Sequence, residues 1–186
     1  ASYQIERILF ADRSEWNIAE IAARTVAGTQ DAMTGTAGDD TFVVDNTLDT
    51  ISEGASQGTD TVLSSVSYTL GANIENLTLT GVLNSNATGN SLDNLIVGNS
   101  SNNVLSSGGG YDILRGGQGD DTYFANGSVV IENAGEGIDT LYDSSSGSYS
   151  LADNVENLVL SSSYVAKTHF FGNAENNVIE VRYGDY

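Results

Sequence analysis

The sequence contains no cysteine and no proline, and it has few basic residues, with six Lys and Arg against 25 Asp and Glu and a formal net charge of −19. Without cysteine, the chain has neither a disulfide nor a thiolate metal site. Without proline, no slow prolyl isomerisation limits its folding. The negative charge argues against nucleic acid and anionic membrane surfaces as partners. No apolar stretch approaches the roughly 18 residues of a membrane-spanning helix.

The length of 186 residues predicts one domain, or one domain with a small appendage. Most acidic residues fall in 35–186, which holds 20 Asp and Glu but only Arg115, Lys167 and Arg182 as basic residues. Such acidity is typical of disordered chains. However, 39% of the residues are hydrophobic and nine are tyrosines, which favours a chain whose folding is conditional. The same charge argues against a polyanionic polysaccharide as a ligand.

A nine-residue pattern repeats four times without a gap in residues 89–124. The units read GNSLDNLIV, GNSSNNVLS, SGGGYDILR and GGQGDDTYF. Each unit has six mostly small or polar turn-forming residues and then a short segment with an apolar residue in its middle. These apolar residues are Ile96, Leu105, Leu114 and Tyr123. Repetition at a fixed period predicts an all-β, parallel solenoid, in which each unit supplies one turn and one strand and its apolar residue packs on equivalents one coil away.

Two units make one coil, so turn residues eighteen positions apart are expected to be neighbours, at about 4.8 Å. This stacks Asn94 over Asp112 and Asn103 over Asp121. A column of carboxylates and amides among turn carbonyls is unfavourable alone, but it suits a hard cation with six to eight oxygen ligands, which is Ca²⁺. Magnesium demands tighter octahedral geometry. The absence of cysteine and the single histidine argue against zinc and copper.

In these residues the chain resembles the RTX (repeats-in-toxin) family, whose calcium-binding nonapeptide reads G-G-x-G-x-D-x-U-x. The best copies are GGQGDDTYF at 116–124 and GTAGDDTFV at 35–43. The resemblance implies a right-handed parallel β-roll with calcium-binding turns. It also implies a bacterial protein that is exported unfolded by type I secretion and folds outside the cell, as a secreted or cell-surface protein.

A larger duplication relates residues 35–97 to 116–180, with an offset of 81 residues at its start. It contains two degenerate units, ASQGTDTVL at 55–63 and AGEGIDTLY at 134–142. Their spacing predicts two sites with two carboxylates each, one from Asp40 with Asp60 and one from Asp121 with Asp139. The Asn94/Asp112 and Asn103/Asp121 pairs are expected to bind more weakly, which gives about four calcium sites. The predicted metal-site residues are Asp40, Asp60, Asp121, Asp139, Asp112, Asn94, Asn103, Gly38, Gly58, Gly119 and Gly137.

Residues 1–31 are expected to form an N-terminal hairpin and a short helix, apart from the β-roll of 35–186. The alternation in 3–10 predicts a strand, and Glu15–Trp16 is expected to begin the return strand. Asn17 followed by Glu20 resembles a capping box and predicts a helix over 18–24. The string IERILFADRSEW resembles a segment that often ends an RTX block, so residues 1–31 are predicted to be the end of a preceding block or a cap.

The sequence favours a non-catalytic calcium-binding module of a larger toxin, adhesin or secreted enzyme, in which calcium switches folding. The alternative is a calcium-dependent module that binds a polysaccharide, a glycan or a host surface receptor through exposed tyrosines, for example Tyr111, Tyr164 and Tyr183. Catalysis is disfavoured, because His169 is the sole histidine and no serine lies in a G-x-S-x-G elbow. The open ends of a solenoid also favour end-to-end association with another copy.

Overall fold

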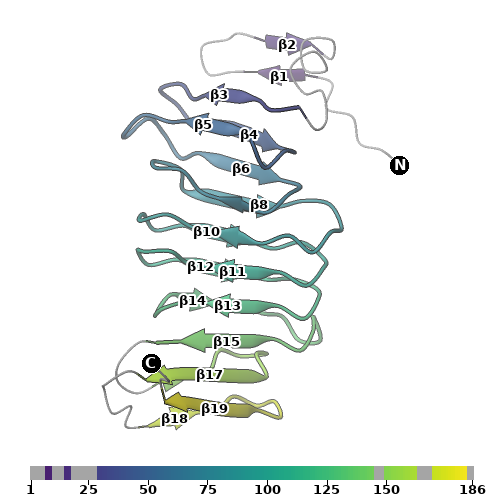
Figure 1. The fold of residues 1–186 in the computed structure, drawn as a ribbon, viewed down its shortest axis with the longest axis vertical. Helices are drawn as coiled ribbons and strands as arrows, with labels where there is room; N and C mark the ends of the chain where they lie inside the picture. Colours follow the sequence, from purple (N-terminus) through teal and green to yellow (C-terminus); the bar gives the residue numbers. More distant parts are fainter. Residues whose placement is uncertain (1–6, 10–14, 18–28, 145–148, 163–168, 184–186) are drawn as a thin grey trace.

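The computed structural model is an elongated β-solenoid whose strands stack along the long axis of the molecule (Figure 1). It describes residues 7–9, 15–17, 29–144, 149–162 and 169–183. After the N-terminal hairpin of β1 (Arg7–Leu9) and β2 (Glu15–Asn17), the even-numbered strands are β4 (Thr41–Val44), β6 (Thr61–Ser64), β8 (Asn76–Leu79), β10 (Leu95–Val97), β12 (Ile113–Arg115), β14 (Val129–Val130), β16 (Tyr149–Ser150) and β18 (Phe170–Phe171). The odd-numbered strands are β3 (Ala32–Thr34), β5 (Thr50–Ser52), β7 (Tyr68–Thr69), β9 (Ala87–Thr88), β11 (Val104–Ser106), β13 (Thr122–Phe124), β15 (Thr140–Asp143), β17 (Asn157–Ser162) and β19 (Val178–Tyr183).

Successive strands alternate between two parallel sheets. The even sheet has six strands in the order β14, β12, β10, β8, β6, β4, and the odd sheet has seven in the order β19, β17, β15, β13, β11, β9, β7. Two further parallel pairs are β3 with β5 and β16 with β18. The turns that lead from an odd strand to an even strand therefore lie on one edge of the solenoid, called the first edge here. The turns that lead from an even strand to an odd strand lie on the opposite, second edge.

The predicted inward-facing residues form the core. In the even sheet, Ile96 pairs with Leu114, and in the odd sheet Leu105 pairs with Tyr123, one coil away in each case. All four side chains are fully buried. The even sheet contributes the ladder Phe42, Val62, Leu77, Ile96, Leu114 and Val130. The parallel all-β fold and the packing of equivalent apolar residues on one another are thus confirmed.

The N-terminal hairpin is present, but the helix predicted after it is not supported. Strands β1 (Arg7–Leu9) and β2 (Glu15–Asn17) pair antiparallel. Asn17, the predicted helix cap, is the last residue of β2 and lies opposite Arg7. The rest of the predicted helix, residues 18–24, lies outside the described residues. No helix occurs among the residues that the structure describes, and hence none that is long and apolar enough to cross a membrane.

The duplicated segments sit on opposite edges of the solenoid. The segment GDDTF that leads into β4 and the segment GDDTY that leads into β13 are equivalent in the duplication. Each strand belongs to one half-coil, and β13 comes nine strands after β4. Because nine is odd, β4 lies in the even sheet and β13 in the odd sheet. Equivalent turns therefore face opposite sides. The boundary between residues 1–31 and 35–186 stays a prediction.

Candidate metal centres

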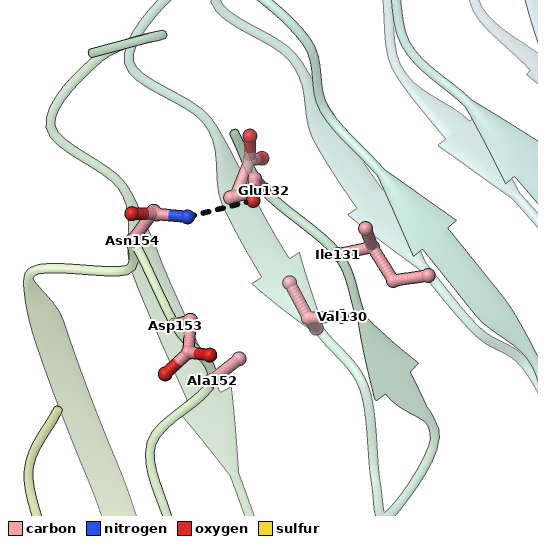
Figure 2. A pocket seen from close by; sticks show the side chains of 6 residues that line it. All are labelled: Val130, Ile131, Glu132, Ala152, Asp153 and Asn154. Atoms are coloured by element: carbon pink, nitrogen blue, oxygen red, sulfur yellow. Dashed lines mark hydrogen bonds between the residues drawn. The ribbon is translucent and has the colours of Figure 1, made fainter. Parts of the chain in front are cut away.

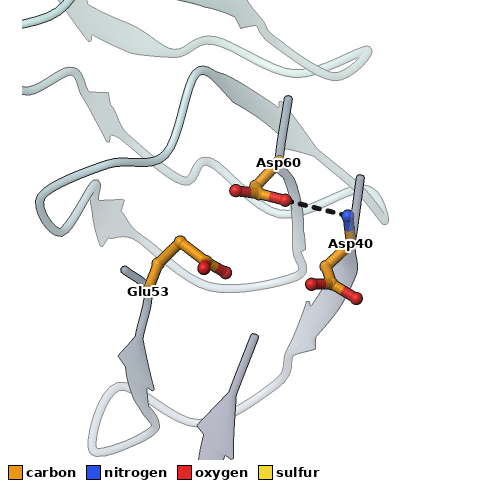
Figure 3. Close-up of side chains that lie close together, drawn as sticks. All are labelled: Asp40, Glu53 and Asp60. Atoms are coloured by element: carbon orange, nitrogen blue, oxygen red, sulfur yellow. Dashed lines mark hydrogen bonds between the residues drawn. The ribbon is translucent and has the colours of Figure 1, made fainter. Parts of the chain in front are cut away.

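Three carboxylates meet on the first edge, near the N-terminal end of the solenoid. Asp40 precedes β4, Glu53 follows β5, and Asp60 precedes β6. One ligand oxygen from each lies within 4.8 Å of the others. Figure 3 shows Glu53 pointing toward the two aspartates. This group, the Asp40 triad, contains the predicted Asp40–Asp60 pair and a glutamate that the sequence analysis did not assign.

Backbone hydrogen bonds hold the two aspartates of the Asp40 triad. The N–H of Asp40 donates to Oδ1 of Asp60 at 2.8 Å, which links turns one coil apart. The N–H of Thr36 donates to Oδ2 of Asp40 at 2.6 Å. By contrast, Oε2 of Glu53 is buried without a hydrogen-bond partner. Burial raises the pKa of Glu53 and of Asp60, and the negative charges of nearby carboxylates raise both further.

The same arrangement recurs on the second edge. Asp121 precedes β13, Glu132 follows β14, and Asp139 precedes β15. One ligand oxygen from each again lies within 4.8 Å of the others. All three residues of this Asp121 triad are buried, with exposed fractions of 1%, 6% and 1%. The predicted Asp121–Asp139 pair is therefore brought together, and Glu132 joins it.

The carboxylates of the Asp121 triad are only partly satisfied within the protein. The N–H of Asn103 donates to Oδ1 of Asp121 at 2.7 Å, and the N–H of Asp121 donates to Oδ1 of Asp139 at 2.8 Å. Oδ2 of Asp121 and both carboxylate oxygens of Glu132 are buried without a hydrogen bond of standard geometry, and the nearby Gly116 N–H only partly offsets the rise in the pKa of Glu132. A buried acceptor without a donor destabilises a fold, so this space suits a group that brings positive charge.

Burial also shifts the ionisation of the Asp121 triad. It raises the pKa of Glu132 to about 8, that of Asp121 to about 7 and that of Asp139 to about 6. In each case burial is the largest cause, and the charges of neighbouring carboxylates add to it. At neutral pH the three groups therefore resist becoming fully negative together. A divalent cation between them would reverse this resistance by favouring the ionised forms.

The predicted glycines allow the turns of each triad to lie against each other. Gly58 has a φ of +136° and Gly119 a φ of +117°, values that L side chains rarely adopt. A Cβ on Gly58 would come within 2.6 Å of the carbonyl carbon of Gly38, and a Cβ on Gly137 would overlap the carbonyl of Gly119. The four glycines thus form two pairs in backbone contact. Turn carbonyls in such positions are the neutral oxygen ligands that calcium takes beside carboxylates.

The two asparagine-containing pairs are also stacked as predicted. The N–H of Asn94 donates to Oδ1 of Asp112 at 2.7 Å, in the same way as Asn103 contacts Asp121. However, Asp112 belongs to no cluster of three acids among the residues that the structure describes, and its Oδ2 accepts a hydrogen bond from the Ser128 hydroxyl at 3.0 Å. This aspartate is therefore satisfied within the protein.

The side-chain amides of these asparagines are also occupied. Nδ2 of Asn94 donates to the carbonyls of Ile74 and Glu75, and Nδ2 of Asn103 donates to the carbonyl of Ser85. The Oδ1 atom of each asparagine accepts a backbone N–H of its own turn. Because both ends of each amide have unambiguous partners, the amide orientation is fixed by its contacts. The amide nitrogen satisfies turn carbonyls that would otherwise need a cation or water.

Comparison with known proteins supports the assignment of the nine-residue repeat. A family model described as RTX calcium-binding nonapeptide repeat (4 copies) matches residues 88–125, the region in which the repeat is unbroken. The chain carries an RTX-type β-roll. RTX nonapeptide repeats bind Ca²⁺, and the two acidic triads of this β-roll could each hold such an ion.

One curated relative of the RTX-type β-roll is the endo-1,3-1,4-beta-glycanase ExsH of Rhizobium meliloti (strain 1021). It is 44% identical over 64 residues, which are 34% of this chain and 14% of the glycanase. The match therefore covers a small part of that protein. No solved structure matches the chain.

The donor sets of the two triads fit calcium. Each triad offers three carboxylates, and the turns around it are in backbone contact through glycines. Calcium takes six to eight oxygen ligands at flexible geometry, including carboxylates and backbone carbonyls. The Asp40 triad and the Asp121 triad would hold the ion, which would neutralise their charge and join neighbouring coils. The metal-ligand roles of the individual residues stay a prediction.

The sequence analysis missed the two glutamates, although a signal for them was present. Glu53 and Glu132 follow short strands and lie outside the nonapeptide units. They are nevertheless at equivalent positions in the two copies of the duplication, and each lies opposite a glycine of the neighbouring coil. A Cβ on Gly35 would overlap the Glu53 carboxyl group. A glutamate and a facing glycine that recur together in both copies are the pattern that would have found them.

A cleft of about 330 Å³ lies beside Glu132, lined by Val130, Ile131, Glu132, Ala152, Asp153 and Asn154. It coincides with a break in the even sheet, because β14 is the last strand of that sheet and β16 pairs with β18. Figure 2 shows Asn154 across the cleft from Glu132, with its Nδ2 donating to the Glu132 carbonyl at 2.9 Å. This bond holds the backbone of Glu132 in place.

Proposed function

We propose that the chain is a non-catalytic module whose folding is switched by calcium, within a larger secreted protein. The observation that carries this proposal is Glu132, whose side chain is buried and whose two carboxylate oxygens lack hydrogen-bond partners. An ionised carboxylate in that state opposes folding unless a cation or a proton neutralises it. Calcium supplies the charge at neutral pH, and the other two carboxylates of the triad complete the acceptor set.

The energy available from calcium is large for a domain of this size. Extracellular calcium modules have dissociation constants near 10⁻⁴–10⁻³ M. At ten to a hundred times the dissociation constant, each bound ion adds about 1.4–2.7 kcal/mol. Two triads would together contribute about 3–5 kcal/mol, against a whole-domain stability of about 5–15 kcal/mol. Calcium also reduces the self-repulsion of a chain with a net charge of −19.

In this proposal calcium acts near the start of each copy of the duplication, at the two triads, and not at the turns of Asn94 and Asn103 that lie between them. The turns that begin at Gly89 and Gly98 are closed by the amides of Asn94 and Asn103, which donate to carbonyls of the preceding coil. The Asp40 and Asp121 triads flank this amide-closed segment, one on each edge. In a compartment with little calcium the flanking coils would stay open, which suits export of an unfolded chain followed by folding outside the cell.

Far-UV circular dichroism during a calcium titration, with magnesium as the control ion, tests the proposal. We expect a cooperative gain of β-structure at submillimolar to millimolar calcium that magnesium does not reproduce. The E53Q/E132Q double variant should lose most of the calcium dependence, whereas D153N, which removes one charge from an exposed residue, should keep it. A chain that is equally folded in chelator and in calcium would contradict the proposal.

A second candidate function is calcium-dependent association with a glycan. The specific observation that favours it is the identity to part of an endo-1,3-1,4-beta-glycanase. Because the chain is strongly acidic, the candidate ligands are neutral glycans. A glycan array probed with and without calcium tests this function. Calcium-dependent binding to neutral glycans would support it, and absence of binding in calcium, or equal binding in chelator, would contradict it.

A further inference from the structure

The core differs at one position between the surroundings of the two triads. Phe42 and Tyr123 each follow a Gly-Asp-Asp-Thr segment and are the second residue of their strand. Both face inward, with exposed fractions of 6% and 0%. The ring of Phe42 has no polar atom, whereas Tyr123 carries a hydroxyl group. The Asp40 triad and the Asp121 triad are therefore not chemically equal.

The hydroxyl of Tyr123 lies at the Asp121 triad. A Cβ on Gly116 would overlap both the Tyr123 hydroxyl and Oδ2 of Asp121, so the two oxygens lie together over Gly116. The pairing of Leu114 with Val130 in β12 and β14 also brings Glu132 toward Gly116 from the next coil. The Tyr123 hydroxyl, Oδ2 of Asp121 and the Glu132 carboxylate thus share this part of the second edge.

None of these oxygens has a hydrogen bond of standard geometry within the protein. The Tyr123 hydroxyl, Oδ2 of Asp121 and both Glu132 oxygens are all buried and unpaired. A buried hydroxyl without a partner costs about 1–3 kcal/mol. Packing does not require it, because Phe42 fills the equivalent place in the other copy. The hydroxyl is therefore an independent sign that a ligand occupies this space.

We propose that the Tyr123 hydroxyl belongs to the calcium site of the Asp121 triad, and that this site binds calcium more tightly than the Asp40 triad. This inference rests on the proposed binding of calcium by the triads. A tyrosine hydroxyl can offer a lone pair to the ion and donate its proton to a carboxylate, here Oδ2 of Asp121. Gly116 is part of the site, because any side chain there would fill the space of these oxygens.

The burial of the two triads points the same way. All three acids of the Asp121 triad are buried, whereas Asp40 and Glu53 of the other triad are partly exposed. A charge interaction is screened less in a buried site. Once ionised, the Asp121 triad therefore combines the stronger electrostatic attraction with one additional oxygen.

Isothermal titration calorimetry with CaCl₂ tests the proposal on the whole chain, with Y123F as the variant and Y111F as the matched control. Tyr111 is 83% exposed and lies on a turn, so its loss removes one tyrosine without touching either triad. We expect two classes of site in the wild type and in Y111F. In Y123F the dissociation constant of the tighter class should rise about tenfold. This factor corresponds to the low end of the free energy of a hydrogen bond to a charged group.

Terbium emission sensitised by tyrosine gives a second readout, because it needs the ring close to the ion. Emission should fall in Y123F much more than in Y111F. Unchanged calcium affinity or unchanged terbium emission in Y123F would overturn the inference while leaving the proposed function intact. Absence of calcium binding in the wild type would overturn both, and circular dichroism of Y123F in calcium separates a binding defect from a folding defect.

Discussion

Replacing Glu132 by glutamine should have opposite effects with and without calcium. Glutamine keeps the size of the side chain and removes its charge. In chelator the change should stabilise the fold, because folding at neutral pH no longer requires the buried Glu132 side chain to take up a proton. In calcium the change should weaken ion binding, because one of three carboxylates of the Asp121 triad becomes a neutral amide.

The size of the effect in chelator follows from the ionisation of Glu132. Burial raises its pKa from the ordinary 4.5 to about 8, so at pH 7 the folded state holds it protonated while the unfolded state does not. The pH of 7 lies 2.5 units above the ordinary pKa of a glutamate, and each pH unit corresponds to about 1.4 kcal/mol. The free energy of unfolding of E132Q should therefore be higher by up to about 3 kcal/mol. For a domain of this size, that is a rise in Tm of roughly 6–12 °C.

Thermal and urea denaturation followed by circular dichroism, in EDTA and in saturating calcium, measures both effects. Where the wild type is unfolded in EDTA, a stabilising osmolyte brings the transition into range. D153N is the control, since it removes one negative charge from an exposed residue near the same cleft. If E132Q loses stability in EDTA as well as in calcium, Glu132 is a structural residue and the reasoning about its buried charge is refuted.

Three further predictions concern the triads, the amide-closed turns and the core. In chelator, the free energy of unfolding should be highest near pH 4 and fall as pH rises to about 8. The folded state raises the pKa of Asp139 to about 6, of Asp121 to about 7 and of Glu132 to about 8, so it binds more protons than the unfolded state. A series of melting curves checks this, and a rise of Tm over that range would contradict it. N103D removes the donor to the Ser85 carbonyl and adds a charge beside Asp121, so urea denaturation in chelator should show a free energy of unfolding lower by about 1–3 kcal/mol. N84D, at an exposed asparagine, is the control and should have little effect. L114A deletes most of a fully buried side chain between Ile96 and Val130. In calcium it should lower the free energy of unfolding by about 2–5 kcal/mol, and an unchanged unfolding midpoint would contradict the described core.

The repeating part of the fold was predictable because one short unit fixes both its turn and its strand. A nine-residue period places Ile96 and Leu114 one coil apart, and the structure pairs them in adjacent strands with both side chains fully buried. The helix predicted over 18–24 depended on a local capping pattern alone and is not borne out. No helix occurs among the described residues, and 18–24 lie outside them.

The candidate sites were predictable only where their residues belong to the repeat. Asp121 and Asp139 are eighteen residues apart and are linked one coil apart as expected, by a hydrogen bond. Glu132 lies outside the nonapeptide units, so its arrival at the same place depends on how the chain returns from β14. The hydroxyl of Tyr123 was hidden because the sequence marks that position only as apolar, and the reach of its ring to Gly116 is a property of the packed core.

The most direct test of the account is the anomalous scattering of calcium in crystals grown with the ion. The account predicts one peak within the Asp40, Glu53 and Asp60 triad and one within the Asp121, Glu132 and Asp139 triad, the latter next to the Tyr123 hydroxyl. It predicts no peak at the turns of Asn94 and Asn103, where amides already bind the carbonyls. Peaks at those turns together with empty triads would contradict it.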